Sequence, residues 1–86
     1  MQATVERKRL ELDTERFDQL VKAFLGELKD YEVGQLFGYD DSVWSLHRSN
    51  KRYVNTHMIA VCMDLFPDVP TKAYCRAVPY QRRGEP

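Results

Sequence analysis

One stretch of the chain, residues 30–52, limits the possible folds more than any other. Its sequence, DYEVGQLFGYDDSVWSLHRSNKR, has the pattern of two short helices joined by a tight turn. Asp30 is a suitable cap for a first helix over residues 31–37. Gly38 then ends that helix, because glycine takes the left-handed backbone conformation at low cost.

A second helix follows the glycine. Asp40, Asp41 or Ser42 can cap it, since each side chain can accept a hydrogen bond from a free backbone N–H. The helix is expected to run to about Ser49. Asn50 stops it, because asparagine is the next-best residue after glycine in the left-handed region.

This stretch resembles the helix-turn-helix of phage Cro and repressor proteins. That family has a small residue in the first helix, here Gly34, and a glycine four residues later at the turn, here Gly38. Apolar residues stand one and six positions after that glycine, here Tyr39 and Trp44. Many members close the second helix with Gly-Lys, and here residues 50–52 (Asn-Lys-Arg) fill that place. The resemblance covers about residues 14–70 and implies a small DNA-binding domain.

The chain departs from the family pattern at three places. Trp44 is bulkier than the usual Ile or Val, and His47 stands where the family often has an apolar residue. Asp40 and Asp41 open the second helix with negative charge. A small helical bundle whose turn happens to contain glycine is the alternative interpretation.

Two further helices flank this pair. The first begins at Asp13 or Thr14 and carries a wide apolar stripe, formed by Phe17, Leu20, Val21, Phe24, Leu25 and Leu28. The other runs from Thr56 to Phe66, capped by Asn55 or Thr56, and is apolar nearly all round, which predicts burial on every side. In so short a chain, a second subunit is one plausible cover for its outer face. We therefore expect a mainly α bundle of four helices, lambda-repressor or Cro-like.

The two ends of the chain add a short β element to this expectation. Residues 4–12 form a short strand or an extended arm, and residues 71–80 alternate as a second strand that pairs with it. Pro79 limits that strand to a sheet edge. Residues 1–80 make one domain, with the helix-turn-helix at 30–52, and residues 81–86 form a flexible tail whose two arginines can touch DNA backbone.

The second helix of the pair has two distinct faces at 100° per residue. Val43, Trp44 and His47 lie on the side that must pack on the preceding helices. The opposite side is small and polar, and is suited to reading base edges in a major groove. Its candidate base-reading residues are Asp41, Ser42, Ser45, Leu46 and Ser49. If these serines are merely solvated, the face has no such role.

The distribution of charge along the chain also favours DNA as the partner. The chain has no net charge, but residues 1–46 carry a net −4 and residues 47–86 a net +4. The positive excess begins at the end of the second helix, where phosphate contacts are needed. The candidate phosphate-binding residues are Arg48, Lys51, Arg52 and Tyr53.

The leading hypothesis is a phage-type transcriptional regulator that binds double-stranded DNA as a homodimer and acts by occupying an operator. The alternative is a protein-interaction module, such as an antirepressor or an inhibitor of a host protein, on the same fold. The acidic first half of the chain favours this alternative. A gel shift against random-sequence competitors would discriminate the two.

No motif indicates an enzyme, a cofactor, a metal site or a small-molecule ligand. Cys62 and Cys75 lack a CxxC spacing, and with no signal peptide or membrane span we expect reduced, buried thiols in a cytoplasmic protein of a bacterial host.

Overall fold

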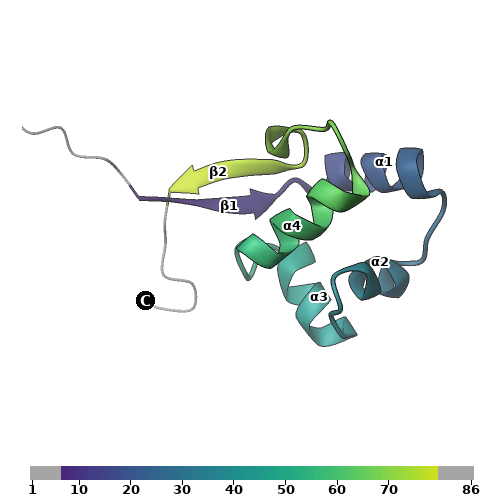
Figure 1. The fold of residues 1–86 in the computed structure, drawn as a ribbon. Coiled ribbons are helices and arrows are strands. Elements are labelled where there is room, and N and C mark those ends of the chain that lie inside the picture. Colours follow the sequence, from purple (N-terminus) through teal and green to yellow (C-terminus); the bar gives the residue numbers. More distant parts are fainter. Residues whose placement is uncertain (1–6, 80–86) are drawn as a thin grey trace, which may run out of the picture.

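The computed structural model describes residues 7–79, and in this part of the chain the fold is mainly α (Figure 1). The helices are α1 (Thr14–Leu25), α2 (Asp30–Leu36), α3 (Asp41–Arg48) and α4 (Thr56–Leu65). Strand β1 (Lys8–Leu12) precedes them, and a short 3-10 helix, η1 (Thr71–Ala73), and strand β2 (Cys75–Pro79) follow. The expected four helices with a β element from the two ends are confirmed. The predicted tail at 81–86 lies outside the described residues, as do residues 1–6 and 80.

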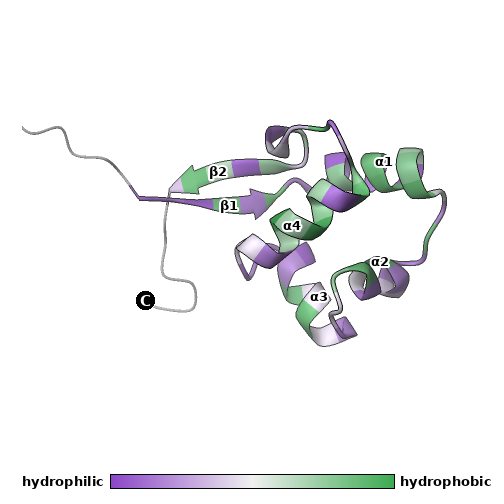
Figure 2. Ribbon diagram, viewed as in Figure 1, coloured by the Kyte–Doolittle hydropathy of each residue, from purple (hydrophilic) through white to green (hydrophobic). Residues whose placement is uncertain are grey.

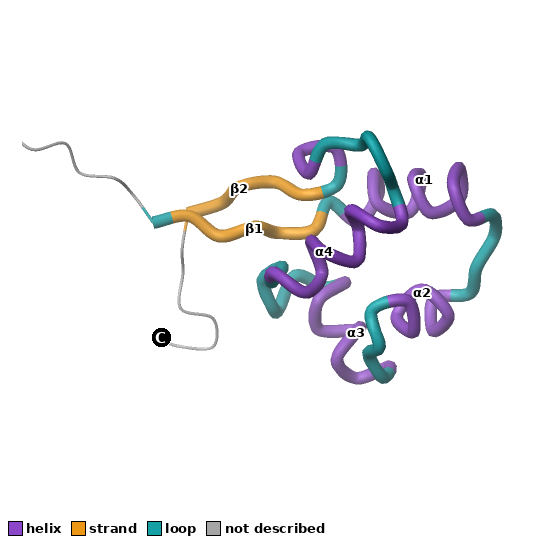
Figure 3. The backbone as a smooth tube through the Cα atoms, in the orientation of Figure 1, coloured by secondary structure: helices purple, strands orange, loops and turns teal. Residues whose placement is uncertain are grey.

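The two strands form an antiparallel ribbon that extends from one side of the helices (Figure 3). Lys8 pairs with Pro79 at one end of the ribbon, and Leu12 with Cys75 at the other. The expected pairing is therefore confirmed, but the second strand starts later than predicted. Residues 71–73 turn instead, because the N–H of Ala73 donates to the carbonyl of Pro70 at 2.9 Å.

Helix α1 begins as expected and ends earlier. The Asp13 side chain accepts from the N–H of Arg16 at 3.3 Å, which makes it the cap. Gly26 has a φ of +86° and stops the helix, so Leu28 lies beyond it and the predicted stripe is too long. Phe24 belongs to that stripe but is 47% exposed.

The core is built around Phe17, which has no exposed surface. Its ring centroid lies 6.0 Å from that of Phe37 and 5.9 Å from those of Trp44 and Phe66. These rings follow or belong to α2, α3 and α4, so α1 holds the other three helices together. Aromatic pairs at this separation add about 0.5–1.5 kcal/mol each beyond the area they bury.

Helix α4 is capped by Asn55, whose side-chain oxygen accepts from the N–H of Met58 at 2.9 Å. Figure 2 shows most of the helix in the hydrophobic colour. Met58 and Cys62 are buried, but Met63 is 63% exposed. The prediction of burial on every side is thus wrong for the single chain, because the other elements pack against only part of the helix.

Within residues 7–79, no helix combines the length and the apolar character that crossing a bilayer requires.

Candidate nucleic-acid interface

The turn between α2 and α3 has the backbone geometry that its glycine predicts. Gly38 adopts a φ of +75°. Its N–H donates to the carbonyl of Gln35 at 2.9 Å, and the N–H of Tyr39 donates to the carbonyl of Gly34 at 3.1 Å. These two bonds make a Schellman motif, which satisfies carbonyls that the end of α2 would otherwise leave free.

Gly34 provides the close approach of α2 to α3. A Cβ atom at this position would lie 2.9 Å from both Cβ and Cγ of Trp44. Atoms at that distance overlap, so only glycine fits without moving one of the helices. The expected small residue in the first helix thus has a direct steric cause here, which is the close approach of the Trp44 Cβ and Cγ atoms.

The inner face of α3 packs against the rest of the fold, and of its three residues Val43 is half-buried. Trp44 is 1% exposed and His47 3%, which confirms that both lie on the packed side of the helix. The Trp44 ring lies 5.5 Å from that of Phe37, and the His47 imidazole stacks on Tyr39 at 5.2 Å between centroids. Burial, followed by the charge of Arg52, lowers the pKa of His47. This face therefore fixes the rotation of α3 about its own axis.

The opposite face of α3 is open to solvent. Asp41, Ser42, Ser45 and Ser49 are exposed and Leu46 is half-buried. The Ser49 hydroxyl donates to the carbonyl of Ser45 at 2.8 Å, and in this arrangement it presents its oxygen lone pairs to solvent. The predicted base-reading residues thus lie on one accessible strip made mostly of small polar side chains.

The two aspartates at the start of α3 differ in their contacts. The carboxylate of Asp40 accepts from the N–H of Val43 at 2.9 Å and caps the helix. Asp41 is the first helical residue and is exposed. Asp30 was predicted to cap α2, but that cap is Lys29, whose own N–H donates to Glu32 at 2.9 Å.

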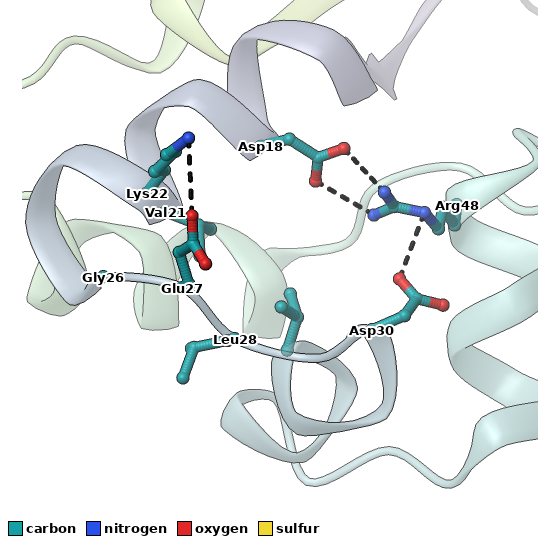
Figure 4. A pocket seen from close by; sticks show the side chains of 9 residues that line it. Asp18, Val21, Lys22, Gly26, Glu27, Leu28, Asp30 and Arg48 are labelled. Carbon is teal, nitrogen blue, oxygen red and sulfur yellow. Dashed lines mark hydrogen bonds and ion pairs between the residues drawn. The ribbon is translucent and has the colours of Figure 1, made fainter.

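Asp30 instead belongs to a polar cluster with Arg48 that joins α1, α2 and α3 (Figure 4). Two guanidinium nitrogens of Arg48 donate to the carboxylate of Asp18 at 3.1 and 2.6 Å. Its Nε lies 3.1 Å from Asp30, which also accepts from the Trp44 indole at 3.1 Å. The bond to Asp18 is the main reason that the pKa of Arg48 is raised.

These contacts give Arg48 a role inside the fold that sequence reasoning missed. Its charge is already matched by two carboxylates, so the structure does not favour the predicted phosphate contact at this position. The partner Asp18 is 30 residues away in the sequence, and no local pattern relates the two. The cluster lines a cleft with a volume of about 310 Å³, and Figure 4 shows Asp18, Asp30 and Arg48 among the side chains around it.

The loop after α3 presents the remaining predicted phosphate ligands. Asn50 has a φ of +61°, as its left-handed stop requires. The N–H groups of Lys51 and Arg52 both donate to the carbonyl of Leu46, at 2.8 and 3.1 Å, and hold the loop against the helix end. Both side chains are exposed, whereas Tyr53 is half-buried.

Tyr39 connects the turn to α4. Its hydroxyl accepts from the Asn55 amide at 3.1 Å, and its ring lies 5.8 Å from that of His57. His57 Nε2 is 2.7 Å from the carbonyl oxygen of Phe37. The apolar residue expected after the turn glycine thus also carries a polar contact to the cap of the next helix.

The two thiols are free and buried. Burial raises the pKa of Cys62 to about 12, with a smaller effect of Cys75, and burial raises the pKa of Cys75 to about 11. Residues 7–79 contain no group of three or more His, Cys, Asp or Glu side chains arranged to hold a metal ion.

Comparisons of this chain with protein-family models, with curated proteins and with solved structures give no match.

Proposed function

We propose that this chain is a sequence-specific double-stranded DNA-binding protein that regulates transcription by occupying an operator. The observation that carries the proposal is the exposed strip of Ser42, Ser45 and Ser49 on a helix whose other face is buried. A helix held by one face and bearing small hydroxyl side chains on the other can enter a major groove. There a hydroxyl can donate to or accept from a base edge.

The remaining polar groups divide between affinity and sequence reading. Lys51 and Arg52 stand at the end of α3, where phosphate contacts position a helix in the groove. Leu46 can contact a thymine methyl group. Asp41 either lowers affinity by repelling phosphates or accepts from a cytosine amino group. Asp40 is occupied as a cap.

The first experiment selects duplexes from a random-sequence pool with the purified protein. Enrichment of one motif is expected. Ser45→Ala and Ser49→Ala should then each change preference at one base position by about 1 kcal/mol or more, while affinity for random duplex stays nearly constant. Gln19→Ala, exposed on α1, is the control and should keep the motif. If neither the wild type nor Asp41→Asn binds any duplex, this function is refuted.

A homodimer is part of the proposal. Met63 on α4 is 63% exposed, and Phe24, whose ring lies 5.5 Å from that of Phe66, is 47% exposed. A second copy would remove this apolar surface from water. The operator would then be an inverted repeat with half-sites about one DNA turn apart. Sedimentation equilibrium should show a dimer that Met63→Glu weakens, and a wild-type monomer at roughly ten times the DNA-binding concentration would count against a free dimer.

A further inference from the structure

The basic side chains in residues 7–79 fall into two groups. One group is paired, with a nitrogen within 4.0 Å of a carboxylate, and consists of Arg16, Lys22, Arg48 and Arg76. The others are exposed, and among them Arg7, Lys8, Lys51 and Arg52 have no carboxylate within 4.0 Å in this part of the chain. These four residues lie in two segments: Arg7 and Lys8 stand just before and at the start of β1, and Lys51 and Arg52 stand in the loop after α3.

These two segments are adjacent although they are more than 40 residues apart in the sequence. The N–H of Val54 donates to the carbonyl of Leu10 at 2.8 Å. Next to this bond, the Arg9 guanidinium lies over the Tyr53 ring, 5.9 Å from its centroid. Lys8 stands two residues before Leu10, and Arg52 stands two residues before Val54. Each is therefore at most about 7 Å along the backbone from the residue that makes this bond. The basic residues at the start of β1 and those of the loop therefore flank one contact between the two segments.

A surface that carries these cations is unfavourable in the free protein. Positive charges gathered around one contact repel each other to an extent that screening over about 10 Å limits at moderate salt concentration. Within residues 7–79, none of the four has a carboxylate within 4.0 Å. A bound polyanion removes the repulsion and releases its own counterions. The clustering of unpaired cations therefore points to a polyanionic partner.

The surface lies at one particular end of α3. The helix has eight residues, so its ends are about 12 Å apart. Asp40 and Asp41 stand at the amino end, and Lys51 and Arg52 follow the carboxyl end. Phosphates are repelled at the first end and attracted at the second.

We propose that DNA phosphates bind a cationic surface formed by Arg7, Lys8, Lys51 and Arg52, beside the carboxyl end of α3. The proposal rests on the function proposed above and adds β1 to the interface. The proposal also implies that Ser45 and Ser49 lie nearer to the bases than Asp41 does. The amino end of α3 then stays at the rim of the major groove.

The test measures affinity for one duplex between 50 and 200 mM salt. The double variants Arg7→Gln/Lys8→Gln and Lys51→Gln/Arg52→Gln each remove two charges from the surface. Each should make the slope of log affinity against log salt about two units less negative. The ratio of wild-type affinity to variant affinity should therefore fall about tenfold between 50 and 200 mM salt. Lys22→Gln/Lys72→Gln, on α1 and η1, removes the same charge elsewhere and should keep the wild-type slope. Equal urea midpoints establish that all variants are folded.

The outcomes separate this inference from the proposed function. If the wild type selects a motif and the β1 variant keeps the wild-type slope, the inference is overturned and the function stands. If slopes change as expected but no motif is selected, the surface is supported and sequence-specific binding fails. Asp41→Asn should leave the selected motif unchanged, and a changed preference at a C·G pair would overturn the position of the helix. A wild type that binds no duplex overturns both.

Discussion

Replacing Gly34 by alanine tests the packing of the helix-turn-helix most directly. The added Cβ would lie 2.9 Å from Cβ and Cγ of Trp44. The Trp44 ring cannot swing away freely, because it packs on Phe17 and Phe37 and its indole N–H donates to Asp30 at 3.1 Å. Its Cβ, being attached to the backbone of α3, moves only if the helix moves.

The expected magnitude follows from two opposing effects. Extra atoms in a tightly packed site cost about 1–3 kcal/mol. Alanine is favoured over glycine inside a helix by about 0.8–1 kcal/mol. Because one of the two short contacts is to a backbone-anchored atom, we place the cost in the upper part of its range and expect a net loss of about 1–2 kcal/mol. In a domain of this size, each kcal/mol lowers the melting temperature by about 4–8 °C.

Urea denaturation followed by the fluorescence of Trp44, the only tryptophan in the chain, measures the change. Gln35→Ala, at an exposed neighbour on the same helix, should stay within about 0.5 kcal/mol of the wild type. In Gly38→Ala the added Cβ would meet no atom within 4 Å, but the backbone φ at this position is +75°. A loss of stability in this variant therefore reports backbone strain without a clash. A Gly34→Ala protein as stable as the wild type would refute the steric argument.

Three further changes test other parts of the structure. Arg48→Lys should cost about 1 kcal/mol in urea denaturation, since lysine cannot form the two parallel bonds to the partly exposed Asp18. The pKa of His47 is lowered from 6.5 in the folded state, so the unfolded chain binds the proton more readily, and stability should fall as the pH drops below 6.5; His47→Gln should weaken this dependence. Because burial raises the pKa of Cys62 to about 12 and that of Cys75 to about 11, both thiols should react slowly with a thiol reagent at pH 8 until urea unfolds the protein, and fast labelling of the native protein would contradict their burial.

The local features of the fold follow from the sequence because their causes are local. Gly38 and Asn50 take positive φ angles where a helix has to stop, and Asp13 and Asn55 cap helices through bonds to residues three positions away. The need for a small residue at position 34 was also predictable, although it became a measurable contact only when two helices were placed against each other.

The features that sequence reasoning missed depend on chain segments that are distant in sequence. The apolar periodicity of α1 continues past Gly26 to Leu28, so periodicity alone could not show that the helix ends. Arg48 looked like a phosphate ligand because it opens the basic segment at the end of the second helix. Its pairing with Asp18 depends on how α1 crosses α3, which neither segment encodes alone.

Fold stability explains only part of the charge pattern around α3, and the unexplained part favours the DNA-binding hypothesis. Acidic residues at the start of a helix and basic residues near its end complement the helix dipole, which accounts for Asp40 and Asp41 without any partner. The alternative of a protein-interaction module therefore gains little from these two aspartates. No helix dipole stabilises Arg7 and Lys8, which stand just before and at the start of β1 and have no carboxylate within 4.0 Å in residues 7–79. Because a negatively charged partner would neutralise cations that the fold itself leaves unpaired, this part of the molecule is the one that favours such a partner.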